Sequence, residues 1–357
     1  MSIRVIGVLF LLLLLFDCGG GDSAAVYYLR PGPNGAAQLY RQPLDGPAEQ
    51  LTGVNDPAAP EVFDFALSPN GRTVVYSTPA GAAGTTLRRL SLTGSGEMTL
   101  LDCPAAECGG LVWSPDGERL IYERRPQADT RPGSVRLNWL DATSGDTAPL
   151  LDADTPASGA RFSLDGEWIS YVSPADEGVV LYRPGDGAQR LLASRVGSPA
   201  AFSPDGAAVV VGDVTVLEGQ TGPEGETSAV YLYRTLLAGD APRERLSPAG
   251  VQADSAPAFS PDGQWIAFGR GPSGAAAGRQ LWLMRAGGGE ARALTNDPDV
   301  FYGPPSWSAD GRTLLYQRFD LSDPAGEPSV WLMDVATGEQ RLLAEGGYLP
   351  VWGPTNR

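Results

Sequence analysis

The stretch Ala258-Phe-Ser-Pro-Asp-Gly-Gln-Trp-Ile-Ala-Phe268 decides the fold, because its pattern recurs along the chain. An apolar pair leads into the tetrapeptide Ser-Pro-Asp-Gly, and an alternating apolar segment follows it. Ser and Pro suit the first two positions of a tight turn, and Gly tolerates positive φ at its end. The stretch therefore predicts a hairpin of two β-strands.

The tetrapeptide occurs six times in variant form, at intervals of 40 to 57 residues. Its copies are Ser68–Gly71, Ser114–Gly117, Ser163–Gly166, Ser203–Gly206, Ser260–Gly263 and Ser308–Gly311. Two more short apolar segments follow several copies, for example Leu281–Met284 and Leu294-Thr295. A unit of four antiparallel strands cannot bury both of its faces alone, so neighbouring units must stack. The repeat predicts an all-β propeller, with a β-solenoid as the alternative.

The two ends of the chain complement each other. Val26–Arg30 reads as a second strand without a first, with Gln38–Arg41 and Glu49–Thr52 as the third and fourth, whereas Tyr348–Pro354 reads as a lone first strand. Joining them completes one unit and removes two exposed sheet edges. We therefore expect a seven-bladed β-propeller of four-stranded antiparallel blades, its last blade closed by the N- and C-terminal strands, with six or eight blades as alternatives.

These units resemble a known repeat. An apolar residue and Trp or Phe before Ser-Pro-Asp-Gly, then Leu-Trp-Leu-Met, Gly-Gly and Leu-Thr, are similar to the TolB-type, WD-like propeller repeat over about residues 25 to 354. The resemblance implies the fold and leaves the function open. TolB itself carries an α/β domain ahead of a six-bladed propeller, which this sequence does not accommodate, so we do not expect a close TolB counterpart.

The N-terminus indicates export. Val5–Phe16 is an apolar run behind Arg4, too short to span a bilayer as a helix, and Cys18 with a Gly-rich spacer follows it. This resembles a bacterial lipoprotein signal, in which the Cys is lipidated, although Asp17 stands where a small residue is usual; an uncleaved anchor or a secreted form are the alternatives. We expect a signal peptide over 1–17, lipidated Cys18 with a linker over 18–24, and one propeller domain over 25–357 outside the cytoplasm, anchored to the membrane at the cell envelope.

Two further cysteines lie close together in Cys103-Pro-Ala-Ala-Glu-Cys108. In an exported chain such a pair predicts a disulfide. A metal site is the alternative, but it needs two more ligands, and without His only carboxylates remain.

Composition removes several classes of function. The chain has no His and no Lys, a formal net charge of −16 and a pI of about 4.4. An acidic chain repels phosphate backbones, which argues against a nucleic-acid partner. The sequence lacks both His and the Gly-x-Ser-x-Gly motif of serine hydrolases. We therefore expect no intrinsic enzymatic activity.

Loop length separates the two faces of the expected propeller. The Ser-Pro-Asp-Gly turns are uniform, whereas the loops on the opposite face vary, and function more often lies on variable loops. The blade-to-blade loops carry carboxylates that we expect to converge near the central channel: Asp56, Asp152, Asp154, Asp254, Asp297 and Asp299. Crowded carboxylates favour a cation such as Ca²⁺ or a basic partner, while simple turn formation is the alternative.

These observations together predict a monomeric, non-catalytic binding or scaffold module at the outer face of the cell envelope. Its variable-loop face would contact a protein or glycan partner, and a lipid anchor would hold it at the membrane. The alternative is an extracellular sensor, or the accessory propeller of a larger complex such as a transporter, kinase or hydrolase.

Overall fold

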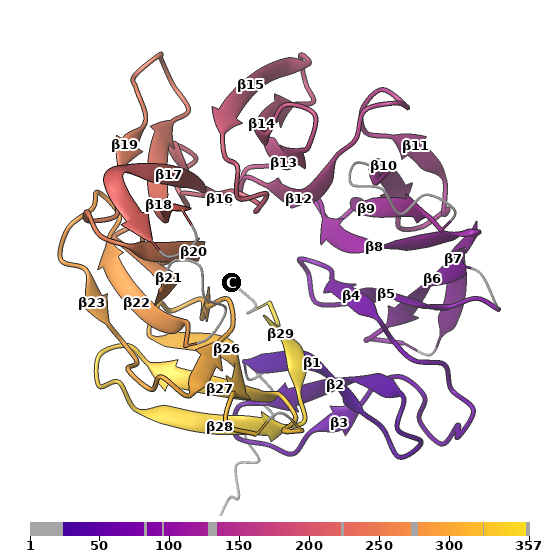
Figure 1. Ribbon diagram of the computed structural model, residues 1–357. Helices are drawn as coiled ribbons and strands as arrows, with labels where there is room; N and C mark the ends of the chain where they lie inside the picture. The colour runs from indigo at the N-terminus through magenta and orange to yellow at the C-terminus, as the bar shows by residue number, and fades with distance from the viewer. Residues whose placement is uncertain are drawn as a thin grey trace, which may run out of the picture.

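The computed structural model describes residues 24–354 apart from 82–83, 95, 128–133, 223–224, 273–277 and 324. Every regular element in these ranges is a β-strand, and the sheets are arranged in a ring (Figure 1). The expectation of an all-β propeller is confirmed. The described part of the chain contains no helix that could cross a membrane.

Hydrogen bonding joins the described strands into six sheets, four of which have four strands. The first contains β29 (Tyr348–Trp352), β1 (Ala25–Pro31), β2 (Ala37–Pro43) and β3 (Glu49–Gln50). The second contains β4 (Asp64–Leu67), β5 (Thr73–Pro79), β6 (Gly84–Ser91) and β7 (Glu97–Pro104). The third contains β8 (Ala106–Trp113), β9 (Arg119–Pro126), β10 (Arg136–Asp141) and β11 (Thr147–Pro149). The fourth contains β12 (Ser158–Phe162), β13 (Ile169–Ser173), β14 (Gly178–Arg183) and β15 (Ala188–Ala193).

The fifth sheet is larger and has two halves. It contains β16 (Ala201–Phe202), β17 (Ala208–Gly222), β18 (Gly225–Leu236), β19 (Glu244–Arg245), β20 (Gln252–Phe259), β21 (Trp265–Pro272), β22 (Gln280–Arg285) and β23 (Arg292–Ala293). Its halves, β16–β19 and β20–β23, are antiparallel within themselves and are joined by parallel pairing of Val230 with Ala253. The sixth contains β24 (Val300–Tyr302), β25 (Ser306–Trp307), β26 (Thr313–Asp320), β27 (Ser329–Asp334) and β28 (Gln340–Glu345). The number of hydrogen-bonded sheets therefore does not by itself give the number of blades.

The chain ends meet in one sheet, as predicted. β29 pairs antiparallel with β1, so that Val26 faces Trp352 and Leu29 faces Tyr348. Figure 1 shows the C-terminal β29 in yellow beside the N-terminal β1 in indigo. Neither strand presents its pairing edge to solvent on that side, and the ring is closed without a free edge there.

The recurring tetrapeptide forms the same turn each time. In Ser260–Gly263 the Ser260 hydroxyl donates to Asp262 Oδ1 over 2.5 Å and accepts the amide of Trp265 over 3.0 Å. Gly263 has a φ of +69°, a conformation that side chains disfavour. Because the side chains of the motif bond within it, the turn is specified locally, which is why it could be predicted from the sequence.

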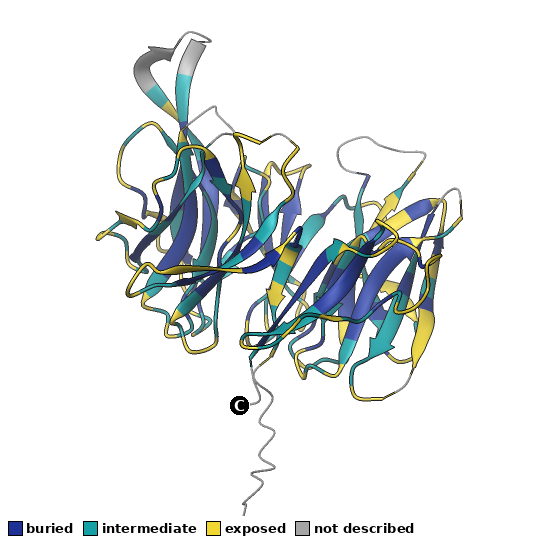
Figure 2. Cartoon of the chain, turned by 90° about the horizontal axis from the view of Figure 1, so that it is seen from below, coloured by how far each residue is buried: buried dark blue, intermediate teal, exposed yellow. Residues whose placement is uncertain are grey.

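Tryptophans that precede these turns connect neighbouring sheets. The indole nitrogen of Trp113 donates to the Ala66 carbonyl over 3.1 Å, and that of Trp307 to the Ala258 carbonyl over 3.0 Å. In each case the acceptor lies on the first strand of the preceding sheet or half-sheet. Buried residues of neighbouring sheets pack in shared clusters. Figure 2 shows the buried strand segments in dark blue.

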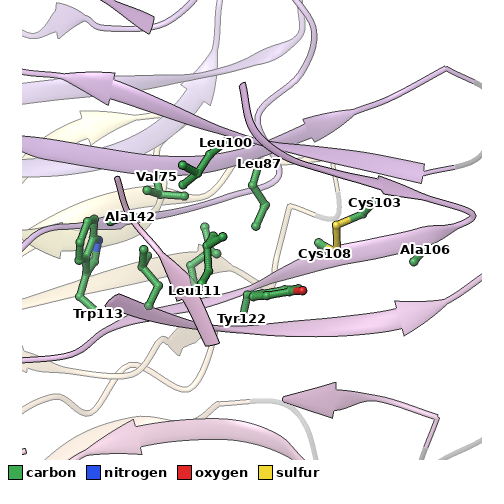
Figure 3. Close-up of a cluster of buried hydrophobic side chains, with 12 residues drawn as sticks. Val75, Leu87, Leu100, Cys103, Ala106, Cys108, Leu111, Trp113, Tyr122 and Ala142 are labelled. Atoms are coloured by element: carbon green, nitrogen blue, oxygen red, sulfur yellow. A yellow bond between two sulfur atoms is a disulfide. The ribbon is translucent and has the colours of Figure 1, made fainter. Parts of the chain in front are cut away.

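The predicted disulfide is present and lies between two sheets. Cys103 lies next to the last residue of β7 and Cys108 lies in β8, with an S–S distance of 2.06 Å. Both are buried in a cluster with Val75 and Leu87 (Figure 3). The bond therefore joins the last strand of the second sheet to the first strand of the third.

Candidate functional site

Asp254 does not belong to an exposed acidic surface, contrary to our expectation. It is fully buried, and its carboxylate accepts hydrogen bonds from Arg270 Nε and Nη2 over 2.6 and 2.8 Å and from Ser247 Oγ over 2.6 Å. A buried carboxylate needs such partners, because leaving it unpaired costs several kcal/mol. Asp254 is thus a structural residue of the ring.

The other predicted carboxylates act in turns. Asp56 Oδ1 accepts the Ala58 amide over 2.9 Å, and Asp297 Oδ1 accepts the Asp299 amide over 3.1 Å. Asp152 and Asp154 lie exposed in their loop. Within the described ranges, no group of three or more Cys, Asp or Glu side chains could hold a metal ion. Cys18, the predicted lipidation site, lies outside the described residues.

A cavity of about 460 Å³ lies instead where the first strands of three successive units reach the tight turns. Its lining includes Phe162, Phe202 and Phe259, each of which directly precedes the turn serine, together with Leu164 and Pro261 from the turns themselves. We call it the phenylalanine pocket. It is at the tight-turn end of the strands, the opposite end from the variable loops that we expected to bind a ligand.

Arg161 is the charged residue in the lining of this pocket. It stands two residues before the turn serine, where the other units have small or apolar side chains: Ala66, Val112, Ala201, Ala258 and Ser306. Gly159 has a φ of +64°, and the register of β12 against β13 shifts between Ser158 and Arg161. The Arg161 side chain is exposed and donates to the Ala160 carbonyl over 2.7 Å; no described carboxylate lies within salt-bridge distance. Most of its N–H groups are therefore available to a ligand.

Glu123 of β9 lies close to Arg161. Its Oε1 accepts the amide of Gly159 over 2.6 Å. The side chain runs past Gly110, where an added Cβ would lie 2.6 Å from Glu123 Cγ, so only glycine fits at that position. Burial raises the pKa of Glu123 and Asp64 raises it further, while the Gly159 amide, Arg125 and Arg161 lower it.

Asp64 of β4 is the third member of the group. Its Oδ2 accepts the Leu111 amide of the next sheet over 3.2 Å, and its Oδ1 accepts the Phe65 amide over 2.9 Å. Burial raises the pKa of Asp64, against the lowering effect of backbone amides and of Arg161. The surrounding strands partly desolvate Arg161 although the residue keeps contact with solvent, and this lowers the pKa of its guanidinium; the charges of Glu123 and Asp64 oppose the lowering. We call Asp64, Glu123 and Arg161 the axial cluster; it spans three successive sheets.

In another unit a glutamine, which carries no charge, accepts the backbone amide that corresponds to Gly159. Gln317 occupies the corresponding place in β26, and its Oε1 accepts the amide of Leu349, which has a φ of +49°. Capping the amide in the next strand therefore does not require a charge. The charge of Glu123 has another consequence: with Asp64 ionised, the axial cluster carries two negative charges against one positive charge.

Sequence reasoning missed this site because its residues come from three units and no motif joins them. A signal was present nonetheless. Arg161 interrupts a position that is otherwise small or apolar in every unit, and Glu123 stands where a related unit has Gln317. Comparing the units position by position would have identified both residues.

Comparisons with known proteins bear on the fold and on the activity. No family model matches the chain. A stretch of 91 residues, 25% of this chain, is 40% identical to the uncharacterized peptidase YuxL of Bacillus subtilis (strain 168), and it spans 12% of that protein. Among solved structures, TolB from Acinetobacter baumannii has a TM-score of 0.55 at 16% identity, covering 94% of this chain and 67% of TolB.

Two hydrolases show the same fold. Puromycin hydrolase has a TM-score of 0.63 at 18% identity, and a prolyl endopeptidase has a TM-score of 0.62 at 15% identity. Each likeness covers 90% of this chain but only about half of the other, 52% and 50% respectively. At such identities these structures establish the fold, which is TolB-like, and the chain is not a close counterpart of TolB.

The expectation of a non-catalytic module is contradicted by these findings. The relative that is 40% identical is named a peptidase, and the structural neighbours include a hydrolase and an endopeptidase. The reasoning failed because the lack of His and of a nucleophile motif concerns only the groups that these residues supply themselves. It does not exclude a propeller from taking part in an enzymatic reaction.

Proposed function

We propose that this TolB-like propeller takes part in peptide hydrolysis and binds the amino end of a peptide substrate at the axial cluster and the phenylalanine pocket. The observation that carries the proposal is the electrostatic coupling of two partly desolvated carboxylates to Arg161, which itself lines an apolar cavity. The stretch of 40% identity to a protein named a peptidase supports the class of reaction.

The charges of the cluster favour an ammonium group. Burial disfavours the ionised forms of Asp64 and Glu123, the charge of Asp64 further disfavours ionisation of Glu123, and Arg161 compensates only one negative charge. A substrate ammonium would neutralise the remaining charge in a site of low dielectric, where such an interaction is stronger than in water. The cluster should therefore prefer a free amino terminus over a blocked one.

The remaining groups suit the rest of a peptide end. Arg161 has N–H donors that bond to none of the described residues, and a peptide carbonyl is their complement. The cavity of about 460 Å³ falls in the size range of small-molecule sites and can accept an apolar side chain against Phe162, Phe202 and Phe259. Recognition would thus combine one charge, one carbonyl and one apolar side chain.

Under this proposal, the groups that cleave the peptide bond are not those of the axial cluster or the phenylalanine pocket. The 357 residues contain no His, so a Ser-His-Asp arrangement needs at least its base from elsewhere. The contribution of the propeller is to hold the substrate, and positioning alone can lower a reaction barrier substantially.

We also propose that the ring has seven blades. The two halves of the fifth sheet each repeat the strand and turn pattern of a single four-stranded unit. Contacts between successive turns support this count: a Cβ built at Gly263 would lie 3.8 Å from Pro204, and one built at Gly311 would lie 3.6 Å from Pro261. The halves thus stand one after the other as neighbouring units do elsewhere in the ring.

Placement at the cell envelope remains part of the proposal. Its support is the apolar run over residues 5–16 followed by Cys18. Labelling with a palmitate analogue should be lost in Cys18→Ala. Equal labelling of both proteins would exclude lipidation at this cysteine.

Calorimetric titration of the full chain with one apolar peptide, in free and N-acetylated forms, tests the proposed site. The free form should bind at least tenfold more tightly, and Glu123→Gln should abolish that preference while leaving the fold intact, because Gln317 shows that Gln can cap the next strand. Asp45→Asn, the same change of charge at an exposed turn, serves as the control and should retain it. Equal affinity for the two peptides in the wild type would refute the proposal.

A further inference from the structure

Arg279, the residue directly before β22, reaches across its sheet to the first strands of two units. Its side chain passes over Gly269 of β21, where an added Cβ would lie 2.7 Å from Arg279 Cδ and 3.0 Å from Nε. Any larger residue at position 269 would occupy the space of the arginine. Glycine at this position, which costs stability in the interior of a strand, therefore gives the guanidinium its path.

The guanidinium ends among groups that carry no negative charge. Nε donates to the Tyr302 carbonyl over 2.8 Å and Nη1 to Ser255 Oγ over 3.3 Å, and the group lies 4.4 Å from the centre of the Phe301 ring. Ser255 belongs to β20, whereas Phe301 and Tyr302 belong to β24. The guanidinium therefore lies where the first strands of neighbouring units meet.

Neighbouring arginines are paired differently. Arg270 is bound to Asp254 at 2.6 Å, and Arg318 lies 3.9 Å from Asp297. Arg279 has no carboxylate within salt-bridge distance among the residues that the structure describes, and the sequence over 273–277, outside the described ranges, contains no acidic residue. Burial lowers the pKa of Arg279 to about 10, with no acidic group acting to restore it. A desolvated cation without a counter-ion is unfavourable, and a bound anion would remove that cost.

We propose that Arg279 is a binding point for the carboxylate of a ligand at the inner side of the ring. Nη2 has no protein partner in the described structure, and the planar guanidinium can bind a carboxylate through two parallel hydrogen bonds. Phe301 packs against one face of the guanidinium and fixes its plane. The inference does not depend on the proposed function, since it involves neither the axial cluster nor the phenylalanine pocket.

Thermal melting of the full chain with added succinate, against sodium chloride at equal ionic strength, tests this site. Succinate should raise the melting temperature of the wild type and of the control Arg292→Met, in which an exposed arginine is removed, but not that of Arg279→Met. An equal rise in Arg279→Met, or no rise in the wild type, would overturn the proposal. Inorganic phosphate provides a second arm, and a larger rise with phosphate than with succinate would overturn the assignment to a carboxylate.

A second variant separates binding from folding. Arg279→Lys keeps the charge but loses the planar fork, so succinate should bind at least fivefold more weakly to it than to the wild type. Unchanged affinity in this variant would show that the fork plays no part. The peptide titration at Glu123 is scored independently, because Arg279→Met should retain the preference for a free amino terminus.

Discussion

Two substitutions at Glu123 separate its structural role from the role of its charge. Glu123→Gln keeps an acceptor for the Gly159 amide, whose nitrogen lies 2.6 Å from Glu123 Oε1 in the wild type. It also keeps the length of the side chain beside Gly110. Glu123→Ala removes both. Because Gln317 already performs this cap in another unit, we expect the two variants to differ greatly in stability.

The magnitudes follow from the contacts. In Glu123→Gln a hydrogen bond to a charged acceptor becomes a neutral one, a loss of about 1 kcal/mol, which the removal of a partly buried charge offsets. In Glu123→Ala the Gly159 amide loses its acceptor, at a cost of about 1–3 kcal/mol. The lost methylene groups add about 0.8 kcal/mol each where they are buried. The Gln variant should therefore remain within about 1 kcal/mol of the wild type, and the Ala variant should lose about 2–4 kcal/mol.

Dependence on pH gives a second readout with a defined sign. Because burial raises the pKa of Glu123 in the folded state, the folded chain holds its proton more tightly than the unfolded chain does. The stabilising contribution is fully present below the unfolded pKa, about 4.3, and is lost as the pH rises through the raised folded value. Between pH 4 and pH 7.5 the Gln variant should therefore gain stability relative to the wild type.

Urea unfolding followed by tryptophan fluorescence, at pH 4 and pH 7.5, measures these differences. A Gln variant as unstable as the Ala variant at pH 7.5 would show that the carboxylate itself holds the ring together. A difference between wild type and Gln that does not change with pH would refute the raised pKa. Either result would remove the basis for assigning a ligand to this charge.

Three further experiments test the description of the ring. Asp254→Ala leaves the buried Arg270 without its partner and should cost about 3–5 kcal/mol in urea unfolding, whereas Asp297→Ala, whose ion pair is long and half-exposed, should cost less than about 1 kcal/mol. Replacing both Cys103 and Cys108 by Ala should lower the free energy of unfolding by about 2 kcal/mol, as for a short closed loop, and unchanged stability would mean that the disulfide is dispensable. Trp352→Phe removes the indole donor to the Ser306 carbonyl and should cost about 1 kcal/mol; no change on calorimetry would argue against that bond.

The local elements could be predicted because their determinants are adjacent in the sequence. The turn at Ser260–Gly263 is held by its own side chains, and the closure of β1 by β29 follows from two incomplete units that fit together. The joining of two units into one sheet over residues 201–293 could not be predicted. It results from the parallel pairing of Val230 with Ala253, which depends on how the two units meet in space.

The position of Asp254 was interpreted wrongly for a related reason. Sequence position places Asp254 in a loop or at a strand start, but it does not show that Arg270 of the adjacent strand lies opposite it. The register of β20 against β21 pairs these two residues directly, and this buries the carboxylate. Charge counted along the chain therefore overstated the negative potential of that face, where two of the expected ligands are counter-ions of arginines.

Departures from the repeat point to the residues that carry specificity. Positions that hold the ring together keep their chemistry from unit to unit, as the turn serines do, because each unit has the same packing problem to solve. Arg161 interrupts a position that is otherwise small or apolar, and Arg279 has no carboxylate within salt-bridge distance among the described residues. A charge that is kept without a partner in the folded chain costs stability. The simplest physical reason for Arg279 is a ligand that supplies the missing partner, whereas Arg161 leaves one negative charge of the axial cluster for a ligand ammonium. The peptide titration and the succinate melts examine the two sites separately.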